Sequence, residues 1–267
     1  QGLTPYFAPM AAPLILVTND DGITAPGIRT LIHAMNQLGD VVVVAPDSPQ
    51  SGMGHAITLH DSLRLKPMSI DAGPQTEYAC SGTPVDCVKL AVHEVLKDRK
   101  PDLIVSGVNH GSNASVNVIY SGTMSAAVEG AMQGVPSIGF SLLDYKWDAD
   151  FRPVEPYLKQ IAQDALTHGL PEGVCLNVNF PNADKAPYAG VRVARQALGF
   201  WKESFEERID PYGKPYYWMR GDYHNPDGAE DTDIWALDHG FVSVVPTQFD
   251  LTAHHALSNL HRRLDQR

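Results

Sequence analysis

Two adjacent carboxylates, Asp20 and Asp21, follow the apolar run Leu14–Thr18 after a single intervening Asn19. They are the residues whose types and spacing point most clearly to chemistry. Neighbouring carboxylates repel each other, which raises a carboxylate pKa unless a cation intervenes. Mg²⁺ or Mn²⁺ would remove that repulsion, and both prefer oxygen ligands. An isolated Asp-Asp-Gly is usually just a turn, but Pro26, typical of a first helical turn, places the next helix several residues later. We therefore interpret the pair as part of a divalent-metal site.

Two further polar loops, Ser48–Gly52 and Ser106–Asn113, also follow predicted buried strands. In open α/β sheets, ligands collect beyond the carboxyl ends of the strands, so we expect the three loops to converge. Ser51 and Asn109 would then add neutral oxygen ligands to the carboxylates. Such an all-oxygen site leaves positions for water and a phosphate group.

Hydroxyl and glycine residues open the Ala-rich helix predicted over 121–133, as Ser121-Gly122-Thr123. The amide groups and dipole of a helix N-terminus favour an anion, although an ordinary Ser/Thr N-cap is the simpler interpretation. Ser81–Thr83 allows the same two interpretations. Among the histidines, which show no His-x-x-x-His zinc pattern, His110 is a candidate to protonate a leaving group.

Alternation of short apolar runs with helical patterns predicts a doubly wound α/β core, a Rossmann-like three-layer α/β/α arrangement with a mostly parallel sheet. Apolar runs predict strands at residues 14–18, 41–45, 103–106, 137–140, 174–180 and 241–245, with shorter strands between 57 and 80. Helical spacing predicts helices at residues 26–38, from 84 onward, 121–133, 156–168 and 253–264.

An aromatic and charged stretch, 200–231, is too apolar for a free linker. It is either an arm that packs on a partner subunit, since aromatic residues are enriched at interfaces, or a hairpin folded over its own domain. We expect a catalytic core at 11–195 with 232–252. The arm and terminal helix, 196–231 and 253–267, are then expected to serve oligomerisation.

Composition excludes several classes of protein. The 267 residues carry a net charge of −11, which opposes binding to duplex nucleic acid. No apolar run reaches the roughly 18 residues of a membrane helix, and residues 1–10 do not resemble a secretory signal. The three cysteines are odd in number and lack the CxxC spacing of a metal site. The sequence therefore predicts a protein of the reducing cytoplasm without a disulfide framework.

The set of motifs resembles the SurE (survival protein E) family of nucleotidases, with block order and spacing kept over about 14–252. The matching blocks are LVTNDDGITAPGI from Leu16, APDSPQSG from Ala45, SGTPVDCV from Ser81, PDLIVSGVNHGSN from Pro101, YSGT from Tyr120, Thr232-Asp233 and GFVS from Gly240. The chain departs from the family pattern at Met124, usually Val, at Ala114-Ser115, usually Leu-Gly, and at 245–247. None of these departures removes a proposed ligand.

This resemblance implies hydrolysis of the phosphate monoester of nucleoside monophosphates, at the 5′ position with the 3′ position as an alternative, by a homodimer or homotetramer. It implies one Mg²⁺ or Mn²⁺ ion per subunit. The family's metal ligands fall on Asp20, Asp21, Ser51 and Asn109, with the two aspartates as catalytic residues. Its phosphate contacts fall on Asn113, Ser121, Gly122 and Thr123.

Two rival functions fit the residues less well. A phosphatase with an aspartyl-phosphate intermediate usually reads Asp-x-Asp, whereas these carboxylates are adjacent. A dinucleotide-binding module without catalysis would place Gly-x-Gly-x-x-Gly after the first strand. That loop instead carries Asn19-Asp20-Asp21-Gly22, whose carboxylates would repel a pyrophosphate. The expected reaction is therefore in-line hydrolysis assisted by a metal ion.

Overall fold

The computed structural model describes residues 11–265. Residues 1–10, which are not expected to be a secretory signal, lie outside the described residues. A nine-stranded sheet forms its centre, in the order β3-β4-β2-β1-β5-β6-β7-β11-β8. The strands are β1 (Leu14–Thr18), β2 (Asp40–Pro46), β3 (Leu65–Met68), β4 (Thr76–Cys80), β5 (Leu103–His110), β6 (Ser137–Leu142), β7 (Val174–Phe180), β8 (Val191–Val193) and β11 (Val242–Gln248). The helices are α1 (Pro26–Met35), α2 (Pro84–Leu90), α3 (Gly122–Met132), α4 (Glu155–His168), α5 (Asp233–Asp238) and α6 (His254–Leu264).

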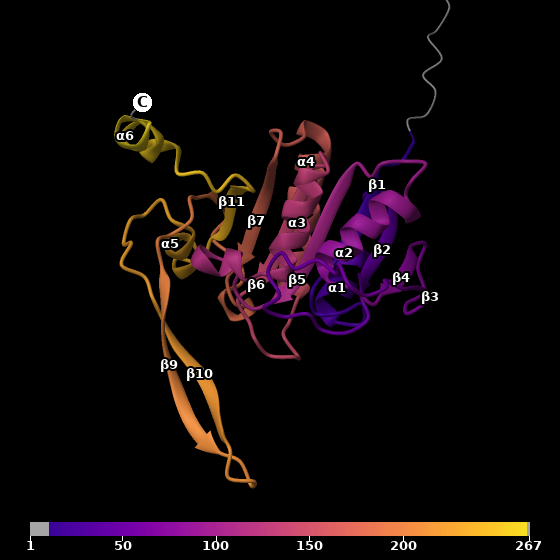
Figure 1. The fold of residues 1–267 in the computed structure, drawn as a ribbon. Helices are drawn as coiled ribbons and strands as arrows, with labels where there is room; N and C mark the ends of the chain where they lie inside the picture. Colours follow the sequence, from indigo (N-terminus) through magenta and orange to yellow (C-terminus); the bar gives the residue numbers. More distant parts are fainter. Residues whose placement is uncertain (1–10, 266–267) are drawn as a thin grey trace, which may run out of the picture.

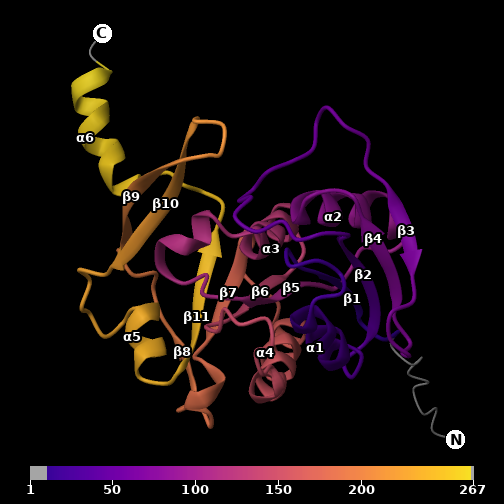
Figure 2. The same cartoon turned by 90° about the horizontal axis from the view of Figure 1, so that it is seen from below.

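The sheet is mostly parallel, as predicted: β4, β2, β1, β5, β6 and β7 run the same way. Strand β3 runs antiparallel to β4, and β11 runs antiparallel to β7 and parallel to β8. Helices α1 and α4 cover one face, and α2 and α3 cover the other (Figures 1 and 2). These three layers confirm the predicted α/β fold. Because β2 and β5 lie on opposite sides of β1, the strand order reverses there, and such a reversal is where open α/β sheets bind ligands.

Local signals explain the helix starts. At α2, the Thr83 side chain accepts a hydrogen bond from Asp86 N–H, and the Asp86 carboxylate accepts one from Thr83 N–H, which together form a capping box at the predicted helix start. Pro26 is the first residue of α1, as predicted. That helix ends at Met35 rather than near Leu38, and α2 continues as a π-helical turn, Ala91–Val95.

Strand β5 is longer than predicted and runs to His110 after an irregularity between Ser106 and Asn109. Asn109 and His110 pair with Ser141 and Leu142 of β6. The prediction of a loop here was wrong because the polar residues interrupt the apolar pattern while the backbone pairing continues. Asn109 is therefore held by the sheet rather than by a loop.

The aromatic stretch forms an antiparallel hairpin of β9 (Phe200–Ile209) and β10 (Pro215–His224). The hairpin extends downward away from the core, and α6 lies away from the core at the upper left (Figure 1). A hairpin folded over its own domain is thus not what the structure shows. Trp201 anchors the hairpin base, since its Nε1–H donates to Asn117 Oδ1 at 2.8 Å. The exposed hairpin and helix remain a predicted oligomerisation arm.

Ser115 occupies a position with φ +54°, in the left-handed region that favours glycine. Its N–H donates to Asp233 at 2.7 Å, and its hydroxyl donates to the Ala197 carbonyl at 2.8 Å. The hydroxyl also accepts from Gly199 N–H at 3.1 Å. These bonds hold Ser115 in this conformation, where the family pattern usually has glycine, and tie the hairpin base to the segment that leads into α3.

Candidate functional site

The candidate site lies at the carboxyl ends of β1 and β5. These strands are paired, with Thr18 opposite Ser106, so the residues that follow them share one edge of the sheet. Asp20 and Asp21 come from the first strand, and Asn109 and His110 end the second. The convergence expected from the sequence thus follows from the register of two adjacent parallel strands.

Asp20 is almost fully buried, at 4% exposure, against the first turn of α3. The Thr123 hydroxyl donates to its carboxylate. A Cβ added at Gly122 would lie 2.8 Å from the Asp20 Cβ, so only glycine allows this approach. Burial and the neighbouring Asp21 charge raise the pKa of Asp20 to about 6, against the lowering effect of the Thr123 hydrogen bonds. Among the described residues no Lys, Arg or His lies within ion-pair distance of this carboxylate, so its negative charge lacks a cationic partner.

Asp21 contacts His110 through two donors. Its Oδ2 lies 3.2 Å from His110 N and 3.1 Å from His110 Nδ1. The other ring nitrogen, Nε2, is buried without a hydrogen-bond partner, and the ring packs between Trp147 and Phe151. Through Nδ1 and its N–H, His110 contacts Asp21, so we expect it to orient this carboxylate. Its role as a proton donor to a leaving group stays a prediction.

The loop that carries Ser51 is tied to both of the other segments. Gln50 N–H donates to the Asp20 carbonyl at 2.7 Å, and Gly54 N–H donates to the Tyr120 carbonyl at 3.1 Å. His55, from the same loop, lies away from the carboxylates and contacts buried Glu129 of α3 at 3.2 Å. These contacts hold the loop that carries the exposed Ser51 against Asp20 and against Tyr120, the residue before Ser121.

The donor set fits a hard divalent cation. Asn109 Nδ2 donates to the Gly111 carbonyl at 2.9 Å, which leaves Oδ1 without a donor among the described residues. Thr18 Oγ1 and Asn19 Oδ1 at the end of β1, and Ser106 Oγ opposite Thr18 in β5, are buried and unpaired. No group of three His, Cys, Asp or Glu residues suited to a metal ion occurs in residues 11–265. A site here would therefore combine two carboxylates with neutral oxygens, a set that suits Mg²⁺ or Mn²⁺ better than zinc.

Asn113 belongs to a buried amide network that the sequence analysis missed. Its Nδ2 donates to Ser141 Oγ at 2.8 Å, and its N–H donates to Asn179 Oδ1 at 2.9 Å. Asn177 donates to the Asn113 carbonyl at 2.8 Å, and Asn179 donates to Asn177. The available signal was the Asn-x-Asn spacing in β7, which puts two polar side chains on one face of a buried strand. The network fixes the segment between β5 and α3.

Ser121 caps α3 by accepting a hydrogen bond from Met124 N–H at 3.0 Å. Thr123 is fully buried and faces Asp20. The three residues 121–123 thus lie beside the carboxylates, where the expected phosphate contacts would have to be. In this arrangement the Thr123 side chain positions Asp20.

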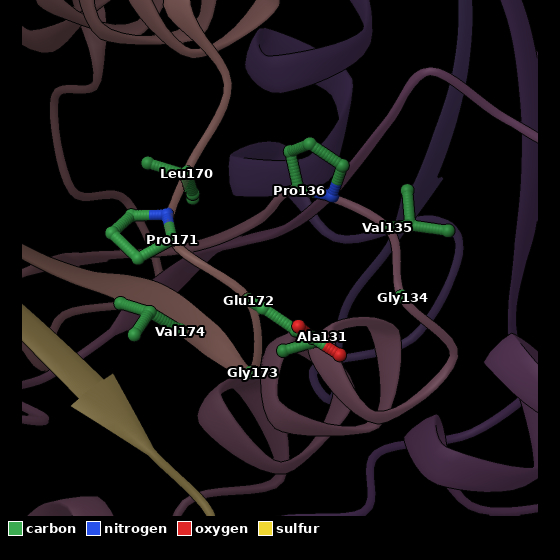
Figure 3. Close-up of a pocket in the computed structure, with 9 residues that line it drawn as sticks. All are labelled: Ala131, Gly134, Val135, Pro136, Leu170, Pro171, Glu172, Gly173 and Val174. Atoms are coloured by element: carbon green, nitrogen blue, oxygen red, sulfur yellow. The ribbon is translucent and has the colours of Figure 1, made fainter.

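A separate cavity of about 310 Å³ lies where β6 and β7 begin, at the opposite edge of the sheet from Asp20 (Figure 3). Its walls are mostly aliphatic or glycine, and Glu172 is its one charged lining residue. The amino ends of parallel strands are not where such folds bind ligands. We therefore assign no function to this cavity.

Fold and site together define a doubly wound α/β protein with an acidic, oxygen-rich site at the reversal point of its sheet. A family model described as survival protein SurE matches residues 15–203, which is well over half of the chain. The chain belongs to the SurE family. This confirms the resemblance found in the motifs.

Curated relatives named 5′-nucleotidase SurE cover nearly the whole chain. The protein from Flavobacterium psychrophilum is 62% identical over 94% of this chain and 98% of its own length. The protein from Cytophaga hutchinsonii is 60% identical over 95% of this chain and 97% of its own length. The crystal structure of the SurE protein from Aquifex aeolicus, 40% identical, superposes with a TM-score of 0.80 over 94% of this chain and 99% of that one. The names of the curated relatives give the enzyme class that the motifs predicted.

No helix within residues 11–265 has the length and apolar character needed to cross a membrane.

Proposed function

We propose that this protein hydrolyses the phosphate monoester of nucleoside 5′-monophosphates in a reaction that requires Mg²⁺ or Mn²⁺, with 3′-monophosphates as a second candidate substrate. The observation that supports it best is Asp20: a buried carboxylate beside a second carboxylate, without a cationic side chain, facing the N-terminus of α3. The names of the curated relatives supply the substrate class. The net charge of −11 makes a cation all the more necessary for attracting a phosphate ester.

In this proposal Asp20, Asp21, Ser51 and Asn109 hold one divalent ion per subunit. Bound there, the ion supplies charge neutralisation for the phosphate and a more acidic bound water. The chain's own residues set the geometry: Thr123 orients Asp20, and His110 orients Asp21. Residues 121–123, at the positive end of the α3 dipole, and Asn113 are proposed to hold phosphate oxygens.

The proposal is tested by measuring phosphate release from AMP, GMP, CMP and UMP, and from 3′-AMP, with Mg²⁺, Mn²⁺ or EDTA. We expect turnover with a divalent ion and none in EDTA. Turnover that persists in EDTA would exclude the metal requirement, and tight AMP binding without turnover under any metal would favour a nucleotide-binding module. Trapping of a phosphoenzyme would support an aspartyl-phosphate enzyme instead.

Thr123→Val keeps the volume of the side chain and removes the hydrogen bond to Asp20. Partners that orient metal ligands are worth about 10- to 100-fold in metal affinity or activity. We expect the Mn²⁺ concentration for half-maximal activity to rise by about that factor, while Thr123→Ser, which keeps the hydroxyl, stays close to wild type. Equal metal dependence of the Val and Ser variants would show that Thr123 does not position a metal ligand.

We also propose that the hairpin and α6 form contacts between subunits of a homodimer or homotetramer. Hairpin side chains Phe205 and Met219 are 68% and 66% exposed, and Leu257, Leu260 and Leu264 line one side of a helix with no buried residue. Apolar surface of this kind is typical of an interface. The three thiols are free and buried, which agrees with the cytoplasmic location that we propose.

Leu260→Glu on α6 and Phe205→Glu on β9 are expected to reduce the mass of the assembly in solution, because each puts a charge into an apolar contact. Light scattering after size-exclusion chromatography measures this mass. Ser258→Glu adds the same charge elsewhere on α6 and should keep the wild-type mass. A monomeric wild-type protein at assay concentration would refute the proposal.

A further inference from the structure

Two exposed aromatic side chains lie in the loop that follows β6, beside the candidate site. Tyr145 is 74% and Trp147 is 68% exposed. Strand β6 pairs with the end of β5, with Leu142 opposite His110, so the loop starts next to the residues that end β5. Large exposed rings at the rim of a site suggest a contact with a ligand rather than with the core.

The Trp147 ring is positioned by the site itself. It stacks on His110, with ring centroids 5.8 Å apart and planes 8° from parallel. His110 Nδ1 in turn lies 3.1 Å from Asp21 Oδ2. One imidazole therefore separates the indole from a carboxylate of the candidate metal site, while Trp147 as a whole stays 68% exposed.

The loop around Trp147 is held by specific contacts. Tyr145 packs on Gly111, whose φ of +103° and lack of a side chain leave room for the ring, and its hydroxyl oxygen accepts from Ser112 N–H at 3.4 Å. The Asp144 carboxylate accepts from Lys146 N–H at 3.0 Å, and Ala149 N–H donates to the Lys146 carbonyl at 3.2 Å. The indole is thus presented by an ordered turn, which reduces the entropy lost when a ligand stacks on it.

We propose that Trp147 stacks on the nucleobase of the substrate while the phosphate lies at Asp20 and Asp21. This inference rests on the proposed nucleotidase function and adds a specificity-determining residue to it. Stacking uses the π-face that every base has, so it accepts all four bases and favours the larger purines. Since the base does not change during hydrolysis, the contact contributes equally to substrate and transition-state binding, and its loss raises KM rather than lowering kcat.

A second candidate binding site for the base lies next to Tyr120, just before the N-terminus of α3. A cavity of about 270 Å³ lies between Tyr120 and the hairpin residues Trp201, Met219 and Arg220. Trp201 donates its Nε1–H to Asn117, and its ring packs on Tyr223. These contacts leave less of its ring available for stacking on a base than in Trp147. The same experiment distinguishes the two places.

The test compares AMP with ribose 5-phosphate, which has the phosphate and sugar but no base, for wild type, Trp147→Ala, Trp147→Phe and Trp201→Ala. Removing a stacking aromatic weakens binding by roughly 5- to 150-fold per base. We expect Trp147→Ala to raise KM for AMP about tenfold more than KM for ribose 5-phosphate, with little change in kcat. Trp147→Phe, which keeps an aromatic face, should recover most of the loss, and adenosine should inhibit Trp147→Ala about tenfold more weakly than wild type.

Equal changes for both substrates would overturn the proposal, because Trp147 would then act only through His110. A base-dependent loss in Trp201→Ala instead of Trp147→Ala would overturn it in favour of the hairpin cavity. Wild-type kcat/KM values that are equal for AMP and ribose 5-phosphate would also overturn it, while leaving the phosphatase function intact. Failure of wild type to release phosphate from either substrate would refute the proposed function itself.

Discussion

Asp20→Asn is expected to lower phosphate release from nucleoside 5′-monophosphates by about 10³-fold or more. The substitution keeps the size of the side chain and an oxygen for the Thr123 hydroxyl, but removes the negative charge that would bind the cation. Metal-assisted charge stabilisation contributes several kcal/mol to such reactions, and each 1.36 kcal/mol is tenfold in rate. The measurement is kcat/KM for AMP at saturating Mn²⁺.

Asp98→Asn is the matched control, because Asp98 is exposed and lies outside the site. It makes the same chemical change and should retain wild-type kcat/KM. Circular dichroism should show the same secondary structure for both variants. Full activity of Asp20→Asn would exclude Asp20 as a metal ligand and leave the proposed mechanism without its central residue.

The stability of the metal-free protein is expected to fall as pH rises through about 6. Burial and Asp21 raise the pKa of Asp20 from 3.8 to about 6, so the folded chain binds this proton more tightly than the unfolded chain. Its stabilising contribution is complete below pH 3.8 and is lost above pH 6. The difference corresponds to roughly 3 kcal/mol at 1.36 kcal/mol per pH unit.

Asp20→Asn should therefore make the metal-free protein more stable at pH 8, by about 1–3 kcal/mol, although it removes activity. Denaturant unfolding in EDTA at pH 5 and pH 8 measures this, with Asp98→Asn as the reference. Added Mn²⁺ should stabilise wild type at pH 8, since it binds only the folded site, and should have little effect on Asp20→Asn. Wild type that is no less stable than Asp20→Asn at pH 8 in EDTA would contradict the account of Asp20.

A substitution that inactivates the enzyme is thus expected to stabilise its fold. Repulsion between Asp20 and Asp21 and the burial of Asp20 oppose folding in the absence of a cation. The same features would make the site attractive to a divalent ion. Functional sites commonly carry this kind of local cost in stability.

The sequence alone determined much of the secondary structure around the site, although not the extension of β5 through Asn109 and His110. Strands β1 and β7 have their predicted bounds. For β1 the reason is a continuous apolar run, which gives a strand buried on both faces. The start of α2 was predictable because Thr83 and Asp86 cap the helix from within four residues. The position of Asp20 and Asp21 beyond a strand end followed from the same local patterns.

Only the tertiary structure decided what these residues contact. The Thr123 hydroxyl reaches Asp20 across 103 positions of sequence, and Trp147 reaches His110 from a different loop. Such pairs depend on strand order, on register and on the path of each loop, and no local pattern encodes these. Apolar spacing and caps act between near neighbours, so the sequence specified the elements and the carboxylate pair, while the packing of the sheet assigned the partners of Asp20 and His110.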